Sequence, residues 1–482
     1  MENSAPPHTL ATPAPAAPQP TARLARELGL FDSTMLVMGG IVGAGIFINP
    51  SVVAERVHTP LLILGAWAAG GIVAILGAFV YAELADRMPN TGGEYAYLRD
   101  CYHPLVGFLF GWVTLLVVMT GGMAAVALTF ARYFLALTGL PFSPAAVVVV
   151  TLSALTLINC SGARLGSRVQ SLLMVLKIIL IVTVIGAGFF FVSHPFSVLH
   201  PASASQAASQ HGASLAVAFG FAIIPVLFSY GGWQTSNYIA GEIRDPRRNL
   251  TRALMIGVAG VILLYLAMNL VCVRALGADG LAATTVPATD VLRRALGSSG
   301  VHIGSQIGVR IVTLGIALSA LGFLSQAILT GPRVYFAMAS DGLFFARVAT
   351  VTRRTRVPAV AILLQSLWTI VIALSGSYEH ILNYVVSINF VFFGLSASCL
   401  FVLRRRDRGH AASSAPAQES RIGFRTPGHP FTTLLFIAIC WAVVLNTIRT
   451  DPRNTLIGFA ILLLGIPVYL IWNHLKKRKR IA

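Results

Sequence analysis

The sequence predicts an all-α membrane protein with 12 transmembrane helices. Of its 482 residues, 56% are hydrophobic and only 11% are charged, whereas about 25% of residues are charged in typical soluble domains. The hydrophobic residues form continuous runs of roughly 20, the length at which a helix crosses a bilayer. They lack the period-two alternation of outer-membrane strands. A soluble fold is therefore excluded, and we expect the lipid bilayer to surround this chain.

Twelve apolar stretches set the approximate bounds of the expected helices. They cover residues 33–56, 61–85, 104–136, 144–160, 168–192, 213–241, 252–275, 309–339, 358–376, 380–403, 431–449 and 454–474.

The positive charges are distributed unequally between the two sides of this arrangement. The net charge is +18, and about three times as many Lys and Arg residues fall in the connections on the side of both termini as in the opposite ones. Cytoplasmic connections are the ones enriched in Lys and Arg. We therefore expect a multi-pass protein of the cell membrane with both termini in the cytoplasm. The same asymmetry accounts for the basic balance without a nucleic acid partner.

Polar segments flank the apolar stretches. Residues 1–30 are rich in proline and predict a disordered cytoplasmic tail. Residues 406–430 predict a cytoplasmic linker, and residues 476–482 a basic cytoplasmic tail. The five cysteines occur singly, without metal-ligand or redox spacing. We expect no cofactor and no bound metal.

Two of the expected helices contain glycine clusters near their middle. The first stretch contains Met38-Gly-Gly-Ile-Val-Gly-Ala-Gly-Ile-Phe47, and the sixth contains Phe228-Ser-Tyr-Gly-Gly-Trp233. Each glycine costs about 1 kcal/mol relative to alanine inside a helix. Irregular backbone at membrane depth is tolerated only where it faces protein or a water-filled cavity. Both helices are thus expected to break, with the breaks facing the interior; close helix packing is the alternative use of such glycines.

The order of these two stretches indicates a function. They lie five spans apart and run in opposite directions, which is the pattern of an inverted-repeat transporter. The N–H groups freed at one break can bind a carboxylate, and the C=O groups freed at the other can bind an ammonium. An α-amino acid presents both groups on one carbon and would match such a pair of breaks.

Several segments resemble one known family of transporters. Gly43-Ala-Gly-Ile-Phe47 resembles the G-S/A-G-I-F signature of the amino acid–polyamine–organocation (APC) superfamily of amino acid permeases. Met88-Pro-Asn-Thr-Gly-Gly-Glu-Tyr-Ala-Tyr-Leu98 is similar to the first cytoplasmic loop of that superfamily. Phe228-Ser-Tyr-Gly-Gly-Trp-Gln-Thr-Ser-Asn-Tyr238 and Glu242-Ile-Arg-Asp-Pro-Arg-Arg-Asn-Leu250 resemble the sixth helix and following loop of L-type amino acid transporters.

The resemblance implies a LeuT-like fold built from two inverted repeats of five helices. Residues 31–192 would form helices 1–5 and residues 213–405 helices 6–10, followed by two extra helices within residues 431–475.

The resemblance also implies a set of substrate-binding residues. They come from the first break, the sixth helix and the tenth helix: Ile41, Ala44, Gly45, Phe228, Ser229, Gly231, Gln234 and Phe390. Gly45 would offer its backbone N–H to the substrate carboxylate, and Phe228 would cover the bound side chain. Gln234 stands where animal relatives often have asparagine. Ordinary helix packing is the alternative role of Phe228 and Phe390.

Lys177 lies inside the fifth stretch. A lysine at the centre of a membrane helix costs about 2.5–3.5 kcal/mol on insertion scales, which favours a functional role. In L-type relatives the corresponding lysine occupies the place of a sodium ion, so the match implies sodium-independent transport. The helix-8 hydroxyl expected beside it is replaced by Ala327, and Ser325 or Gln326 is the substitute. Lys177 could instead reach the membrane interface or carry a coupling proton.

The leading hypothesis is sodium-independent exchange of neutral amino acids. No acidic residue lies in the stretches expected to line the pocket, so a cationic side chain would lack a partner. A proton-coupled symporter is the alternative mechanism, and a non-transporting amino acid sensor is an alternative class. The histidines and carboxylates form no intramembrane catalytic pattern, so we expect no enzyme. The connection at residues 133–145 has no cysteine, so we expect no disulfide-linked glycoprotein subunit.

Overall fold

The computed structural model describes residues 24–192, 215–297, 302–376, 378–413 and 423–481. The helices in chain order are α1 (Leu30–Ile41), α2 (Gly45–Val57), α3 (Pro60–Arg87), α4 (Glu94–Cys101), α5 (Pro104–Val113), η1 (Thr114–Val118), α6 (Met119–Thr138), α7 (Pro144–Cys160), α8 (Ala163–Phe191), α10 (Leu215–Ser229), η2 (Trp233–Glu242), α11 (Pro246–Ala282), α12 (Pro287–Gly297), α13 (His302–Thr330), α14 (Pro332–Ser340), η3 (Ala346–Ala349), α15 (Ala359–Leu374), α16 (Tyr378–Ser413), α17 (Phe431–Thr450) and α18 (Pro452–Ile481). The described residues form no strand, and the all-α prediction is confirmed for them.

Helix occurs in every one of the expected apolar stretches. In the described part of the chain, eight helices are long and apolar enough to cross a membrane, or nine when the bent pair α1 and α2 counts as one span. The shorter apolar helices α7 and α15 occupy the fourth and ninth stretches. The sixth stretch holds α10 and the 3₁₀ helix η2. The protein is therefore a helical, multi-pass membrane protein.

Proline marks where many of these helices begin. Pro60, Pro104, Pro144, Pro246 and Pro332 each occupy the first turn of their helix. This position suits proline because the first N–H groups of a helix have no intrahelical partner in any case. These five prolines thus mark helix starts, whereas Pro50, Pro225 and Pro467 lie inside α2, α10 and α18.

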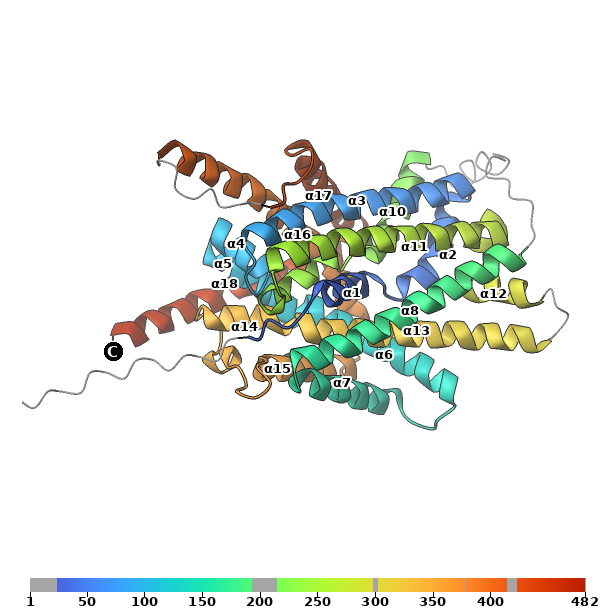
Figure 1. Ribbon diagram of the computed structural model, residues 1–482, viewed down its shortest axis with the longest axis horizontal. Coiled ribbons are helices and arrows are strands. Elements are labelled where there is room, and N and C mark those ends of the chain that lie inside the picture. Colours follow the sequence, from blue (N-terminus) through green and yellow to red (C-terminus); the bar gives the residue numbers. More distant parts are fainter. Residues whose placement is uncertain (1–23, 193–214, 298–301, 377, 414–422, 482) are drawn as a thin grey trace, which may run out of the picture.

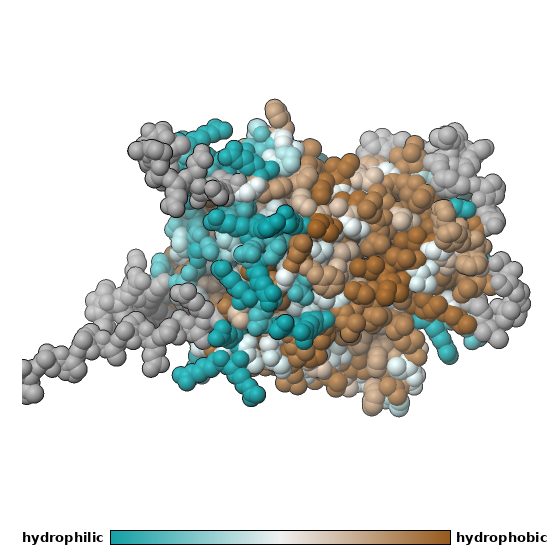
Figure 2. All heavy atoms as spheres, viewed as in Figure 1, coloured by the Kyte–Doolittle hydropathy of each residue, from teal (hydrophilic) through white to brown (hydrophobic). Residues whose placement is uncertain are grey.

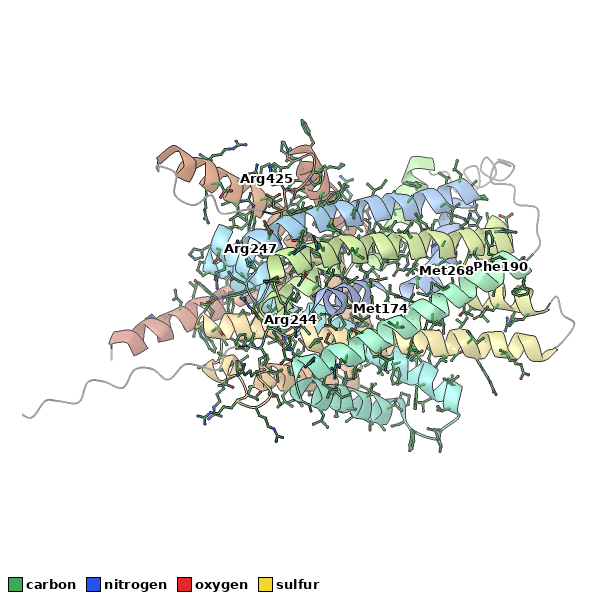
Figure 3. All side chains as sticks on the ribbon, viewed as in Figure 1. Met174, Phe190, Arg244, Arg247, Met268 and Arg425 are labelled. Carbon is green, nitrogen blue, oxygen red and sulfur yellow. The ribbon has the colours of Figure 1, made fainter. Side chains whose placement is uncertain are left out.

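The long helices lie side by side along the long axis of the molecule (Figure 1). Hydrophilic side chains gather at one end of it, and a hydrophobic belt covers much of the remaining visible surface (Figure 2). Arg244, Arg247 and Arg425 lie at the hydrophilic end, and Phe190 lies near the opposite end (Figure 3). We call the hydrophilic end the arginine end. An apolar belt of this kind is what a membrane-spanning helical protein presents to lipid.

The expected disordered tail, residues 1–30, does not extend to the start of α1, because the residues just before α1 are docked. Residues 1–23 lie outside the described residues, but Leu28 is buried. The backbone N–H groups of Glu27 and Leu28 donate to the carbonyl of Glu242, and the N–H of Arg244 donates to the carbonyl of Leu28. An expectation from composition alone missed this docking because backbone bonds do not depend on side-chain type.

The two other polar segments are also partly ordered. Helix α16 continues to Ser413, inside the expected linker, and α18 continues to Ile481, inside the expected basic tail. Residues 414–422 lie outside the described residues. After them, the backbone N–H groups of Gly423 and Phe424 donate to the Asp86 carboxylate at the end of α3. The linker is therefore anchored to α3 rather than free.

Candidate functional site

The first expected break is present between α1 and α2. Helix α1 ends at Ile41, α2 begins at Gly45, and the two helices meet at a bend of 40°. Val42 caps α1 in an extended conformation. The first N–H groups of α2 have no partner within their helix, and neither do the last C=O groups of α1. Both kinds of backbone group therefore become available at one place in the interior.

The second expected break follows α10. That helix ends at Ser229, and η2 begins at Trp233. Gly232 has a φ of 107°, a conformation that glycine adopts without strain. A Cβ on Gly232 would lie 2.1 Å from the carbonyl oxygen of Gly40, so the two breaks touch backbone to backbone. Only glycine fits at this crossing.

Tyr265 of α11 joins the two breaks through a side chain. Its hydroxyl lies 3.2 Å from the carbonyl oxygen of Ile41 and 3.3 Å from that of Ser229. A single hydroxyl hydrogen is thus shared between the end of α1 and the end of α10. Tyr265 is fully buried, and the sequence analysis did not identify it. A tyrosine in an apolar stretch gives no signal of such a role.

Lys177 of α8 points inward rather than toward the membrane interface. It is buried, and its Nζ donates a 2.8 Å hydrogen bond to the carbonyl of Val42. Ser319 of α13 donates to the same carbonyl at 3.4 Å. The Ser325 hydroxyl, expected as the partner of Lys177, is buried without a hydrogen-bond partner among the described residues. The hydroxyl that accompanies the lysine at the break is therefore that of Ser319.

A cavity of about 280 Å³ lies at the two breaks. Its wall contains all eight residues expected to bind substrate: Ile41, Ala44, Gly45, Phe228, Ser229, Gly231, Gln234 and Phe390. Lys177 and Ser325 are not part of the wall; Lys177 acts from behind it, on Val42.

Phe228 is 58% exposed although it is a large apolar side chain near the end of the apolar helix α10. Its ring forms part of the cavity wall. Beside it, the Ser229 hydroxyl accepts a 2.7 Å hydrogen bond from the Asn49 amide of α2 and donates to the carbonyl of Pro225. The side-chain carbonyl of Gln234 accepts from the N–H of Gly232 at 3.0 Å. These bonds hold the irregular backbone of the breaks in one shape.

Further residues of the cavity wall were missed by the sequence analysis. They include Thr114 and Val118 of η1, Thr235 and Tyr238 of η2, Ser319 and Gln326 of α13, and Asn389 of α16.

The segment η1 is a π-helical turn, a form that is concentrated at functional sites. The sequence of η1 contains no signal that predicts a π-helical turn. The Gln326 amide donates to the Thr235 hydroxyl at 2.6 Å and so joins α13 to η2. Among the described residues, none that forms the cavity wall is charged.

The segment η2 runs from the cavity to the arginine end, where several contacts hold it. The Arg333 guanidinium of α14 forms two parallel hydrogen bonds with the Glu242 carboxylate, at 2.7 and 3.0 Å, and both side chains are fully buried. Arg99 of α4 pairs with Asp341 after α14. Together with the docked Leu28 backbone, these pairs join η2, α4, α14 and the segment before α1 at the arginine end.

A bundle of membrane helices with a central cavity at two broken helices defines a membrane transporter rather than an enzyme. A family model described as amino acid permease matches residues 28–469, and the chain belongs to this family. It is 30% identical over 464 residues to the large neutral amino acids transporter small subunit 2 of Mus musculus, covering 94% of this chain and 83% of that protein.

Other relatives carry related names. The chain is 28% identical over 460 residues to the serine/threonine exchanger SteT of Bacillus subtilis (strain 168), covering 95% of this chain and 98% of that protein. It is 30% identical over 395 residues to the b(0,+)-type amino acid transporter 1 of Homo sapiens, covering 80% and 77% of the two chains. All three relatives are named as amino acid transporters or exchangers.

Proposed function

We propose that this protein exchanges neutral amino acids across the cell membrane by alternating access, without sodium. The main support is that two helix breaks meet at one cavity. At the first break, Lys177 already donates a hydrogen bond to the carbonyl of Val42. The architecture that we propose is LeuT-like: 12 crossings, with α1–α8 and α10–α16 as inverted repeats and α17 and α18 added.

The backbone of the cavity suits an α-amino acid. The N–H groups of the first turn of α2, beginning at Gly45, carry the positive end of the helix dipole and would bind the carboxylate. The last carbonyls of α10, ending at Ser229, carry the negative end and would bind the ammonium. Phe228 would then close over the side chain of the bound amino acid.

The cavity wall supports a neutral side chain. An acidic or basic amino acid would bring a charge into a site whose wall holds no charged residue. Burying an unpaired charge costs several kcal/mol or more. Apolar contacts from Phe323, Phe390 and Phe393 and hydrogen bonds from Gln326 and Asn389 would serve neutral side chains instead.

Lys177 supports sodium independence. A sodium ion at the break would need the freed carbonyls of α1 as ligands, since hard cations bind through oxygen. The Val42 carbonyl already receives hydrogen bonds from Lys177 and Ser319. A fixed ammonium thus supplies the positive charge that an ion would otherwise bring.

The arginine end would face the cytoplasm, because cytoplasmic connections are enriched in Lys and Arg. Both termini would then be cytoplasmic, and this structure would be closed on that side. The protein would act without a disulfide-linked glycoprotein. Cys101, Cys272, Cys399 and Cys440 are buried, and the connection between α6 and α7 contains no cysteine.

Purified protein in liposomes tests the proposal. We expect uptake of a labelled neutral amino acid into vesicles that are preloaded with unlabelled amino acid, equal in sodium and in choline buffers. Empty vesicles should show little uptake. A panel of competing amino acids would then rank the side chains. Uptake into empty vesicles that follows an imposed pH gradient would replace exchange with proton-coupled symport.

A further inference from the structure

Glu94, the first residue of α4, is a buried carboxyl group that the proposed transport cycle does not yet use. Its side chain is 1% exposed. One oxygen accepts a 2.5 Å hydrogen bond from the Tyr81 hydroxyl and a longer one, at 3.4 Å, from Ser396. The other oxygen accepts from the Tyr238 hydroxyl at 2.8 Å. Three neutral hydroxyl groups therefore surround this carboxyl group.

These contacts bring together four separate elements. Tyr81 belongs to α3, Glu94 to α4, Tyr238 to η2 and Ser396 to α16. A backbone hydrogen bond also links the segment before α4 to η2: the N–H of Gly92 donates to the carbonyl of Tyr238 at 2.9 Å. Movement of η2 away from α4 would break the Tyr238–Glu94 hydrogen bond and the Gly92–Tyr238 backbone bond.

Tyr238 also joins Glu94 to the transport path. Its side chain forms part of the cavity wall while its hydroxyl donates to the Glu94 carboxyl group. Only one phenol therefore separates this carboxyl group from the cavity. A change in the cavity or in η2 would reach Glu94 directly.

No cation faces Glu94 from any element packed around it in the described structure. The groups that face it are phenols and thiols, all neutral near pH 7: Tyr81 of α3, Tyr97 of α4, Tyr238 of η2, Cys399 of α16 and Cys440 of α17.

Two buried carboxylates further along these elements do have cationic partners. Glu83 binds Arg87 and Arg404, and Glu242 binds Arg333. A buried carboxyl group without a cation is the kind of group that binds a proton.

We propose that Glu94 is a proton-binding site, and that its proton keeps the arginine end of the transport path closed. The role in gating rests on the proposed exchange function, whereas the binding of the proton does not. When η2 moves and the arginine end opens, water reaches the carboxyl group and the proton leaves for that water. When the end closes, Glu94 takes a proton back.

The direction of the effect follows from burial. Burial raises the pKa of Glu94 from 4.5 to about 7, although the hydroxyl groups of Tyr81, Tyr238 and Ser396 act in the opposite direction. In an open, hydrated state the pKa would return toward its ordinary value. Protonation therefore favours the closed state, and deprotonation favours opening.

The first experiment measures the exchange rate in liposomes. The pH of the solution that faces the arginine end is varied from below to above 7. We expect the wild-type rate to rise with pH, with a midpoint near 7. Glu94→Gln imitates the protonated acid and should keep the low rate at every pH. The exposed Glu55 provides a matched control, and Glu55→Gln should keep the wild-type profile. A wild-type pH step that persists in Glu94→Gln would overturn the proposal, as would a constant high rate.

Variants of the donors test the site without removing the carboxyl group. Tyr81→Phe removes a 2.5 Å hydrogen bond that favours the ionised form. It should move the midpoint upward by about one pH unit, which is a tenfold change in proton affinity. Ser396→Ala removes the 3.4 Å contact and should move the midpoint less. Unchanged midpoints in both variants would assign Glu94 a packing role only.

A second readout needs no transport. The pKa of Glu94 is higher in the folded protein than its ordinary 4.5. Its contribution to stability is therefore full below pH 4.5 and is lost as pH rises through about 7. The melting temperature of the wild type relative to Glu94→Gln should fall across this window. A constant difference would overturn the proton site. If the wild type exchanges no amino acid at any pH, the proposed function fails while this melting test still decides the proton site.

Discussion

The Nζ of Lys177 lies 2.8 Å from the carbonyl oxygen of Val42, at the residue where α1 stops being a helix. The last carbonyls of a helix carry a partial negative charge, and a donor from another helix, 135 positions away, satisfies one of them here. The first break is therefore joined directly to α8.

Lys177→Ala is expected to reduce exchange at least tenfold while leaving expression intact. The variant removes the positive charge at the break and leaves the Val42 carbonyl with only the longer bond from Ser319. Lys177→Met keeps the apolar stem and should lose as much activity, which separates charge from packing. Initial exchange rates in liposomes measure both. Wild-type rates in Lys177→Met would reduce the lysine to a space-filling role.

Gly45→Leu is expected to abolish binding of the amino acid. Even a Cβ at this position would lie 2.8 Å from the Ser229 hydroxyl and 3.1 Å from the Asn49 amide. A longer side chain would also cover the N–H groups of α2. Binding of a labelled neutral amino acid to purified protein provides the measurement. No described residue lies within 4 Å of a Cβ added to Gly186 of α8, and Gly186→Leu is the control that should bind normally.

Tyr265→Phe is expected to weaken amino acid binding about fivefold with little change in folding. The substitution removes the hydroxyl that bridges Ile41 and Ser229 and preserves the ring. A hydrogen bond of this kind contributes about 1 kcal/mol net, which is roughly a fivefold change in an equilibrium constant. Competition binding gives the affinity. An unchanged affinity would show that each break keeps its shape without this bridge.

Separating the Arg333–Glu242 pair is expected to destabilise the protein strongly. Removing one partner leaves the other charge buried and unpaired, at a cost of about 3–5 kcal/mol. Arg333→Met and Glu242→Gln should each lower the melting temperature markedly. The double variant should lose less than the two single losses together, because no unpaired charge remains. Additive losses in this cycle would argue against a direct interaction.

The helix breaks and the cavity wall followed from the sequence because glycine content is a local property. The clusters around Gly43 and Gly231 weaken a helix wherever they occur, and the resemblance to known permeases supplied the positions of Phe228 and Phe390. The structure brings all of these residues to one cavity.

The partners of the breaks could not be found in the same way. A carbonyl such as that of Val42 accepts from any donor that packs against it, and the sequence does not give the rotation of α13 relative to α8. Ser325 or Gln326 was therefore expected where Ser319 lies. Glu94 had the opposite problem: it belongs to a loop motif, and loop carboxylates are normally solvated. Its burial results from four elements meeting in space.

The backbone hydrogen bonds at Leu28 form a second contact at the arginine end, chemically different from the side-chain cluster at Glu94. Peptide groups alone form it, with the chain before α1 bonded to the carbonyl of Glu242 and the N–H of Arg244. Neither salt nor acidity alters such groups, whereas Glu94 responds to acidity. The arginine end is thus held by two kinds of contact, one that is independent of pH and one that depends on it. Cellular conditions can regulate only the pH-dependent one.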